Sequence, residues 1–130
     1  MKNSILILIL TLTACTFSRE SSVNQSAGIE KLDVEIFQSR VKETPNAVVL
    51  DVRTPEEFAE GNIEGAINID FKAPDFEQKI GELDKNKTYL VYCLSGIRSK
   101  KAADRMSELG FESLYVLNGG YSAWTETPNE

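Results

Sequence analysis

The chain contains no histidine and only two cysteines among its 130 residues. Without histidine, the Ser-His-Asp and Cys-His catalytic arrangements are excluded. Two cysteines alone supply too few of the nitrogen and sulfur ligands that a structural zinc site needs, so we expect no metal and no cofactor. Chemistry near neutral pH must therefore depend on a thiolate, carboxylates, lysine, arginine, tyrosine or backbone amides.

An excess of positive charge is also missing. The 14 lysines and arginines are outnumbered by 20 aspartates and glutamates, which gives a net charge of −6. Because nucleic-acid binding needs clustered lysine and arginine, we expect no nucleic-acid partner. A hydrophobic fraction of 42% and a charged fraction of 26% are ordinary for a soluble globular protein, and the length predicts one domain.

The apolar run near the N-terminus is short. Residues 4–11 follow the basic start Met1-Lys2-Asn3. They fall short of the roughly 20 apolar residues of a transmembrane helix, and they match the apolar region of a secretory signal peptide. Leu12-Thr13-Ala14-Cys15 then resembles the lipobox of bacterial lipoproteins, in which cleavage precedes a lipidated cysteine. We therefore expect a signal peptide at 1–14, lipidated Cys15 and a flexible tether at 15–28, and a domain at 29–127.

This interpretation predicts a protein of the cell envelope. Acyl chains on Cys15 would anchor it to the lipid bilayer of a bacterial membrane, each buried CH₂ contributing ~0.8 kcal/mol, with the domain facing the periplasm or the cell exterior. The alternative is an ordinary signal peptide with a chance cysteine at position 15. If Cys15 is lipidated it cannot form a disulfide, so Cys93 is the only free thiol.

From Ile29 onward, short apolar runs alternate with helical patterns. Strands are expected at 47–52, 66–69, 88–92 and 114–117, helices beginning at Asp33, Thr54, Pro74 and Ser99, and a short amphipathic segment after Gly119-Gly120. Thr54 and Glu57 are spaced as a capping box, with Pro55 at the first helical position. The alternation implies an α/β fold with an open, mainly parallel sheet flanked by helices.

Cys93 ends an apolar strand, where open α/β sheets place their binding crevices. Between that strand and the next helix, a tight loop would turn several backbone N–H groups inward as an anion cradle, and Gly96 suits such a loop. Arg98 adds a positive charge that could contact an oxyanion. The loop would thus both ionise the thiol and bind the anion that the thiolate attacks.

A second interpretation of Cys93 is structural, because free cysteine is among the most buried residue types. The presence of Gly96 and Arg98 in a strand–loop–helix context favours the nucleophile. A nucleophilic role also requires a thiol that is not closed off from solvent.

Four segments in order resemble the rhodanese-like domain family, and the resemblance covers about Ile29 to Thr125. They are Asp51-Val52-Arg53-Thr54-Pro55-Glu56-Glu57-Phe58, Gly61-Asn62-Ile63-Glu64-Gly65-Ala66-Ile67-Asn68-Ile69, Tyr92-Cys93-Leu94-Ser95-Gly96-Ile97-Arg98-Ser99 and Leu117-Asn118-Gly119-Gly120-Tyr121-Ser122-Ala123-Trp124. The family often has histidine where this chain has Asn62. The resemblance implies a five-stranded parallel sheet whose active-site loop begins at Cys93.

It also implies a sulfurtransferase. Cys93 would take a sulfur from a small sulfur-containing anion such as thiosulfate, hold it as a persulfide, and pass it to a thiol or cyanide-like acceptor. The amides of Leu94, Ser95, Gly96, Ile97, Arg98 and Ser99 would stabilise the persulfide and the donor oxyanion, while Asp51 and Arg53 would hold the neighbouring loop. From the residues alone, Asp51 could instead simply accept loop N–H bonds, and Arg53 could be a solvated or paired surface charge.

Two other functions stay open. Cysteine phosphatases place five residues between cysteine and arginine, whereas Cys93 and Arg98 are separated by four, which disfavours a phosphatase or an arsenate reductase. A non-catalytic module that binds a partner or senses sulfide is the third possibility, and the retained cysteine argues against it.

Overall fold

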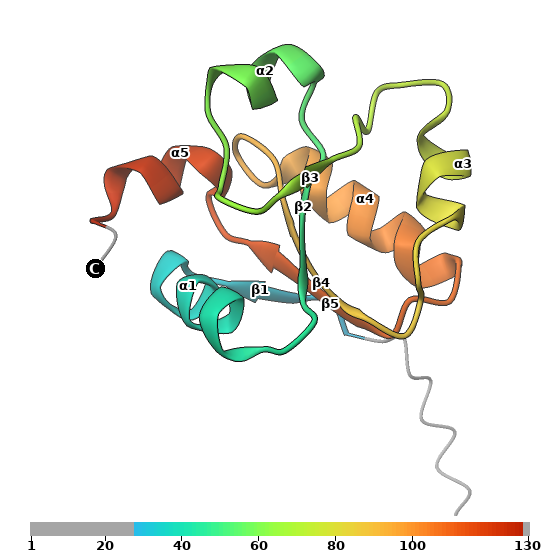
Figure 1. The fold of residues 1–130 in the computed structure, drawn as a ribbon, viewed down its shortest axis with the longest axis horizontal. Helices are drawn as coiled ribbons and strands as arrows, with labels where there is room; N and C mark the ends of the chain where they lie inside the picture. Colours follow the sequence, from blue (N-terminus) through green and yellow to red (C-terminus); the bar gives the residue numbers. More distant parts are fainter. Residues whose placement is uncertain (1–27, 129–130) are drawn as a thin grey trace, which may run out of the picture.

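A computed structural model describes residues 28–128 as a sheet covered by helices on both faces (Figure 1). The strand order is β1-β5-β4-β2-β3, and every neighbouring pair is parallel. The strands are β1 Glu30–Leu32, β2 Val48–Asp51, β3 Ile67–Asn68, β4 Thr88–Tyr92 and β5 Ser113–Leu117. The helices are α1 Val34–Glu43, α2 Pro55–Glu60, α3 Phe76–Gly81, α4 Ile97–Glu108 and α5 Gly120–Glu126. The predicted α/β class and five-stranded parallel sheet are confirmed.

The two faces of the sheet build two separate cores. Along the central strand β4, Tyr89 and Val91 join the core beneath α3 and α4, whereas Leu90 and Tyr92 join the core beneath α1 and α5. All four are at most 1% exposed. This burial on both sides explains why β4 is a continuous apolar run instead of an alternating one.

Local signals set where the helices begin. Thr54 Oγ1 accepts a hydrogen bond from the Glu57 amide at 3.3 Å and Glu57 Oε1 accepts from the Thr54 amide at 3.4 Å, so the predicted capping box is confirmed. Asp33 lies at the N-cap position of α1 but its side chain does not cap that helix. Its carboxylate instead accepts from Asn118 Nδ2 at 2.9 Å, which ties the start of α1 to the turn after β5.

One strand was missing from the sequence-based expectation. β1 is three residues long and lies at the sheet edge, paired only with β5, so it carries no long apolar run. The predicted strands at 47–52 and 66–69 are each one residue too long at both ends. The helix expected from Ser99 begins two residues earlier, at Ile97.

The predicted signal peptide, Cys15 and most of the tether lie outside the described residues, so their assignment stays a prediction. Within residues 28–128, no helix has the length and apolar content needed to cross a membrane.

Candidate active site

Cys93 follows β4 directly, at the edge of the sheet where the carboxyl ends of the parallel strands meet. The loop from Cys93 to Gly96 leads into α4, and α2 lies over the same end of the sheet (Figure 1). β4 lies between β2 and β5, so the cysteine is at the middle of that edge. This is the position at which α/β folds place their binding crevices.

The loop folds its polar groups around the sulfur. The Gly96 amide donates to Cys93 Sγ at 3.1 Å, and Sγ lies 3.4 Å from Ser99 Oγ. Gly96 has φ +99°, a left-handed conformation that turns its amide inward and that glycine adopts without penalty. Burial raises the pKa of the Cys93 thiol, but hydrogen bonds from Ser99 and from the amides of Gly96 and Ser95 outweigh it, so the pKa lies below its ordinary value.

The same contacts cover the sulfur. Cys93 is only 1% exposed and packs in the core beneath α4, so the expectation of an open thiol is wrong for this conformation. The physical reason is that the loop closes inward to bring its amides to Sγ. The outer surface of the loop is apolar, because Leu94 is 43% and Ile97 66% exposed.

The start of α5 holds the Cys93–Gly96 loop from the other side. The amides of Tyr121 and Ser122 donate to the carbonyls of Cys93 at 2.7 Å and Leu94 at 3.1 Å. Gly120 has φ +61°, and a Cβ on it would lie 2.5 Å from Cys93 O and from Leu94 C and O. The sequence-based reasoning gave this segment no part in the site, although the Gly119-Gly120 pair was the available signal.

Asp51 and Arg53 form a buried ion pair beside the loop. The Asp51 carboxylate accepts from Arg53 Nη2 at 2.7 Å, from its Nε and from its backbone amide. Arg53 Nη2 also donates to Gly61 O at 2.6 Å, and the guanidinium lies 4.3 Å from the Tyr121 ring centroid. Arg53 is 3% exposed, so its interpretation as a surface charge is wrong.

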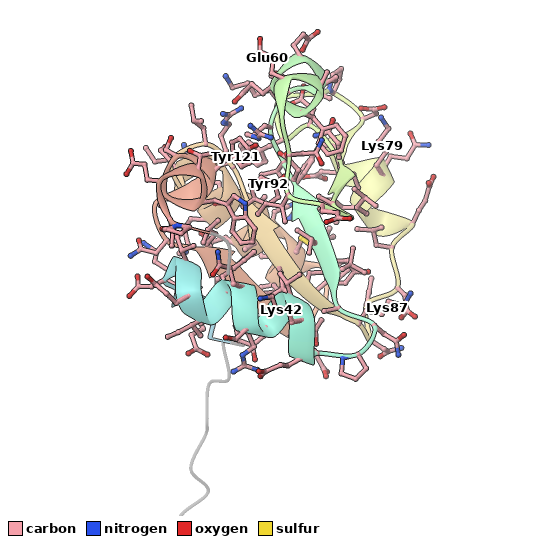
Figure 2. All side chains as sticks on the ribbon, turned by 60° about the vertical axis from the view of Figure 1, so that its left-hand side comes forward. Lys42, Glu60, Lys79, Lys87, Tyr92 and Tyr121 are labelled. Carbon is pink, nitrogen blue, oxygen red and sulfur yellow. The ribbon has the colours of Figure 1, made fainter. Side chains whose placement is uncertain are left out.

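Two tyrosines connect this pair to the loop. Figure 2 shows Tyr92 of β4 and Tyr121 of α5 close together. Their ring centroids are 6.0 Å apart. Tyr92 Oη accepts from the Ile63 amide at 3.1 Å, which fixes the segment after α2. The Asp51–Arg53 pair is thus placed to support the loop that follows α2, and among the residues described neither side chain forms a hydrogen bond with Sγ.

Arg98 binds a carboxylate of the protein. Its Nη1 and Nη2 donate to Glu57 Oε1 and Oε2 at 2.8 and 3.0 Å, across the gap between α4 and α2. These bonds lower the pKa of Glu57 to about 2. The contact of Arg98 with a donor oxyanion stays a prediction, and its two terminal nitrogens are occupied in this conformation.

Of the remaining loop residues, Leu94, Ser95 and Gly96 lie between β4 and α4, whereas Ile97 and Ser99 belong to α4. Ser95 is exposed, Ser99 is fully buried in the first turn of α4, and Leu94 and Ile97 form the outer surface. Within residues 28–128, no three cysteine or acidic side chains lie close enough together to hold a metal ion.

Comparison with known proteins gives the class. A sequence profile described as the rhodanese-like domain matches residues 33–127. This range includes the Cys93 loop and the helices on both faces of the sheet. The chain belongs to the rhodanese-like domain family.

Individual relatives agree with that assignment. The chain is 34% identical to the thiosulfate sulfurtransferase GlpE of Shewanella oneidensis over 87 residues, which are 67% of this chain and 84% of that protein. It is 32% identical to a solved rhodanese-related protein of Thermoplasma volcanium, with a TM-score of 0.65 over 75% of this chain and 91% of the other. A solved protein of Rhodopseudomonas palustris, described as a possible tyrosine phosphatase, is 27% identical with a TM-score of 0.60 over 78% and 85%. The family therefore includes named sulfurtransferases.

Proposed function

We propose that the protein is a sulfurtransferase in which Cys93 carries sulfane sulfur as a persulfide. The observation that carries this proposal is the set of hydrogen-bond donors around Sγ, which lowers the pKa of a buried thiol against the effect of burial. A merely structural cysteine in an apolar core has its pKa raised instead. The same donors can stabilise the negative charge that a persulfide places one sulfur further out.

The reaction balances without a cofactor. The Cys93 thiolate attacks the outer sulfur of a donor such as thiosulfate, a sulfur–sulfur bond forms, and the donor's own sulfur–sulfur bond breaks. Sulfite leaves with the electron pair of the broken bond. A thiol or cyanide-like acceptor then attacks the outer sulfur of the persulfide, and Cys93 leaves as a thiolate, ready for the next donor.

Because Cys93 is buried, the donor reaches Sγ only when the loop moves outward. The side chains of Leu94 and Ile97 are exposed, so little packing holds the outer face of the loop. The carbonyls of Cys93 and Leu94 stay bound to the amides of α5, which confines the movement to Ser95 and the residues after it.

Intact mass measurement tests the proposal. In a Cys15→Ser background Cys93 is the only thiol of the chain. Treatment with excess thiosulfate should add the mass of one sulfur atom, cyanide should remove it with release of thiocyanate, and Cys93→Ser in the same background should gain nothing. An unmodified protein under excess donor would contradict a sulfurtransferase.

A non-catalytic, partner-binding module is the second candidate, and the 1% exposure of Cys93 is the observation that favours it. It predicts no mass gain and no thiocyanate. A phosphatase would instead hydrolyse an aryl phosphate. We expect no such hydrolysis, because only four residues separate Cys93 from Arg98 and because Arg98 is bound to Glu57.

We further propose that this activity lies in the cell envelope, with Cys15 lipidated and the domain held outside the cytoplasm. What supports it is the lipobox-like segment Leu12-Thr13-Ala14-Cys15 after a short apolar run.

A further inference from the structure

The surroundings of the catalytic loop contain little free positive charge on the side of α2. The guanidinium of Arg98 is 18% exposed and is joined through both terminal nitrogens to Glu57, which is 28% exposed. A bidentate arginine–carboxylate pair uses two of the five N–H donors of the guanidinium and neutralises its charge at close range. The Arg98–Glu57 pair carries no net charge, so it attracts a second anion only weakly while the pair persists.

Glu57 is itself fixed in place. It occupies the N3 position of the capping box, so its Oε1 also accepts from the Thr54 amide at 3.4 Å and lies 3.2 Å from Thr54 Oγ1. One carboxylate thus caps α2 and holds the first turn of α4. Its pKa of about 2 keeps it ionised at every pH at which the protein would work.

On the side of α2, the outer surface of the loop fits an apolar group of a donor better than a charged group. Leu94 lines a hollow of about 320 Å³ together with Arg53, Glu57 and Glu60. Arg53 is buried against Asp51 and Glu57 is paired with Arg98, so the unpaired charge among the residues that line this hollow is the Glu60 carboxylate. A dianion such as thiosulfate would meet the Glu60 carboxylate with no unpaired cation beside it, whereas an apolar group would meet the exposed Leu94 side chain.

We propose that Glu57 is a specificity-determining residue, and that the preferred donor is an organic sulfane-sulfur compound with a carbon substituent and a single negative charge. The inference rests on the proposed sulfurtransferase function and assigns its donor class. By occupying Arg98, Glu57 disfavours thiosulfate, whose second negative charge has no partner at the loop.

The step balances for such a donor. For an organic thiosulfonate, the Cys93 thiolate attacks the terminal sulfur, that sulfur's bond to the sulfonyl sulfur breaks, and a sulfinate leaves with the electron pair. For an organic persulfide the leaving group is a thiolate. Neither case needs an added oxidant or reductant.

Three lysines lie near the loop on its other side. Lys31, Lys100 and Lys101 line a hollow of about 300 Å³ that also contacts Gly96. Lys100 pairs with Asp104 on the same helix. If a donor approached through the lysine-lined hollow, the dianion thiosulfate would be favoured over a monoanion. A comparison of the two kinds of donor therefore tells whether the donor enters beside the lysines or beside Glu57.

The test compares benzenethiosulfonate with thiosulfate, because both carry a transferable outer sulfur and differ in charge and in the carbon group. Rates of sulfur addition to Cys93 are followed by intact mass in the Cys15→Ser background. Each rate is divided by the rate of the same donor with free N-acetylcysteine, which removes the donor's intrinsic reactivity. The unaltered loop should favour benzenethiosulfonate by about tenfold or more on this scale.

Glu57→Gln should raise the thiosulfate rate by about tenfold, because it frees a charge-assisted donor pair on Arg98, and should change the benzenethiosulfonate rate far less. Glutamine keeps the capping-box hydrogen bond, so α2 should still form. Glu77→Gln is the matched control, since it breaks the bidentate pair with Arg105, also on α4, and makes the same change in net charge. It should alter neither rate.

Equal normalised rates for the two donors, or an equal rise of both in Glu57→Gln, would overturn the inference and leave the sulfurtransferase intact. The absence of any mass gain with either donor would contradict the proposed function itself, and this inference with it.

Discussion

Replacing Gly120 by alanine should damage the site without touching Cys93. Gly120 has φ +61°, and an added Cβ would lie 2.5 Å from three backbone atoms of Cys93 and Leu94, closer than the 3.0 Å below which real Cβ contacts essentially do not occur. Backbone atoms cannot rotate away as a flexible side chain can. Cys93 and Leu94 must therefore shift, and the hydrogen bonds that they accept from the amides of Tyr121 and Ser122 must lengthen.

The structure offers a control that separates strain from collision. Gly65 also has a positive φ, +80°, but a Cβ on it would meet nothing within 4 Å. Gly65→Ala should cost about 1 kcal/mol of unfolding free energy, from backbone strain alone. Gly120→Ala should cost about 3 kcal/mol, from a similar strain plus the forced movement of packed backbone.

Urea unfolding of the two variants measures these costs, and the rate of sulfur addition measures the site. Gly65→Ala should keep the rate of the unaltered protein, whereas Gly120→Ala should lose most of it under conditions where it is still folded. If Gly120→Ala were no more costly than Gly65→Ala and equally active, the support of the loop by α5 would be refuted.

Three further predictions concern single interactions. Ser99→Ala should raise the pKa of Cys93, because it removes a hydrogen bond to the thiolate, and the pH dependence of thiolate absorbance checks this. Glu57→Gln should lose about 1 kcal/mol of stability near neutral pH, an amount discounted for the partial exposure of the pair with Arg98. Since the pKa of Glu57 falls from 4.5 to about 2 on folding, this difference should be full above about pH 4.5 and vanish as the pH falls through about 2, as urea unfolding at each pH would show. Cys15→Ser should release the protein from bacterial membranes in cell fractionation, whereas a protein that stayed with the membrane would contradict the lipid anchor.

The fold could be predicted from the sequence where single elements carry strong local signals. The apolar run of β4 and the spacing of Thr54, Pro55 and Glu57 each depend on neighbouring residues, so a short window contains the information. β1 could not be predicted in this way, because a three-residue edge strand is defined by its pairing with β5 and not by its own composition.

The inward-turned amides of the site could be predicted from the sequence, whereas the contacts of its side chains could not. Gly96 before a helix indicates inward-turned amides, and the structure brings them to Sγ. The partner of Arg98 could not be read from the sequence, because Glu57 lies 41 residues away and meets it only through the packing of α2 against α4. The burial of Cys93 could not be predicted either, because the loop is held closed by contacts with Gly120 and α5, which lie far along the chain.

Titration of Cys93 is the most direct test of the proposed function, because sulfur transfer here depends on a thiolate stabilised by the loop. The absorbance of the thiolate is recorded against pH as the difference between the protein and its Cys93→Ser variant, which removes any contribution from Cys15 and does not require the sulfur to be accessible. We expect the pKa of Cys93 to lie below that of an ordinary cysteine. A pKa at or above the ordinary value would mean that burial outweighs the amides, and would contradict the proposed function.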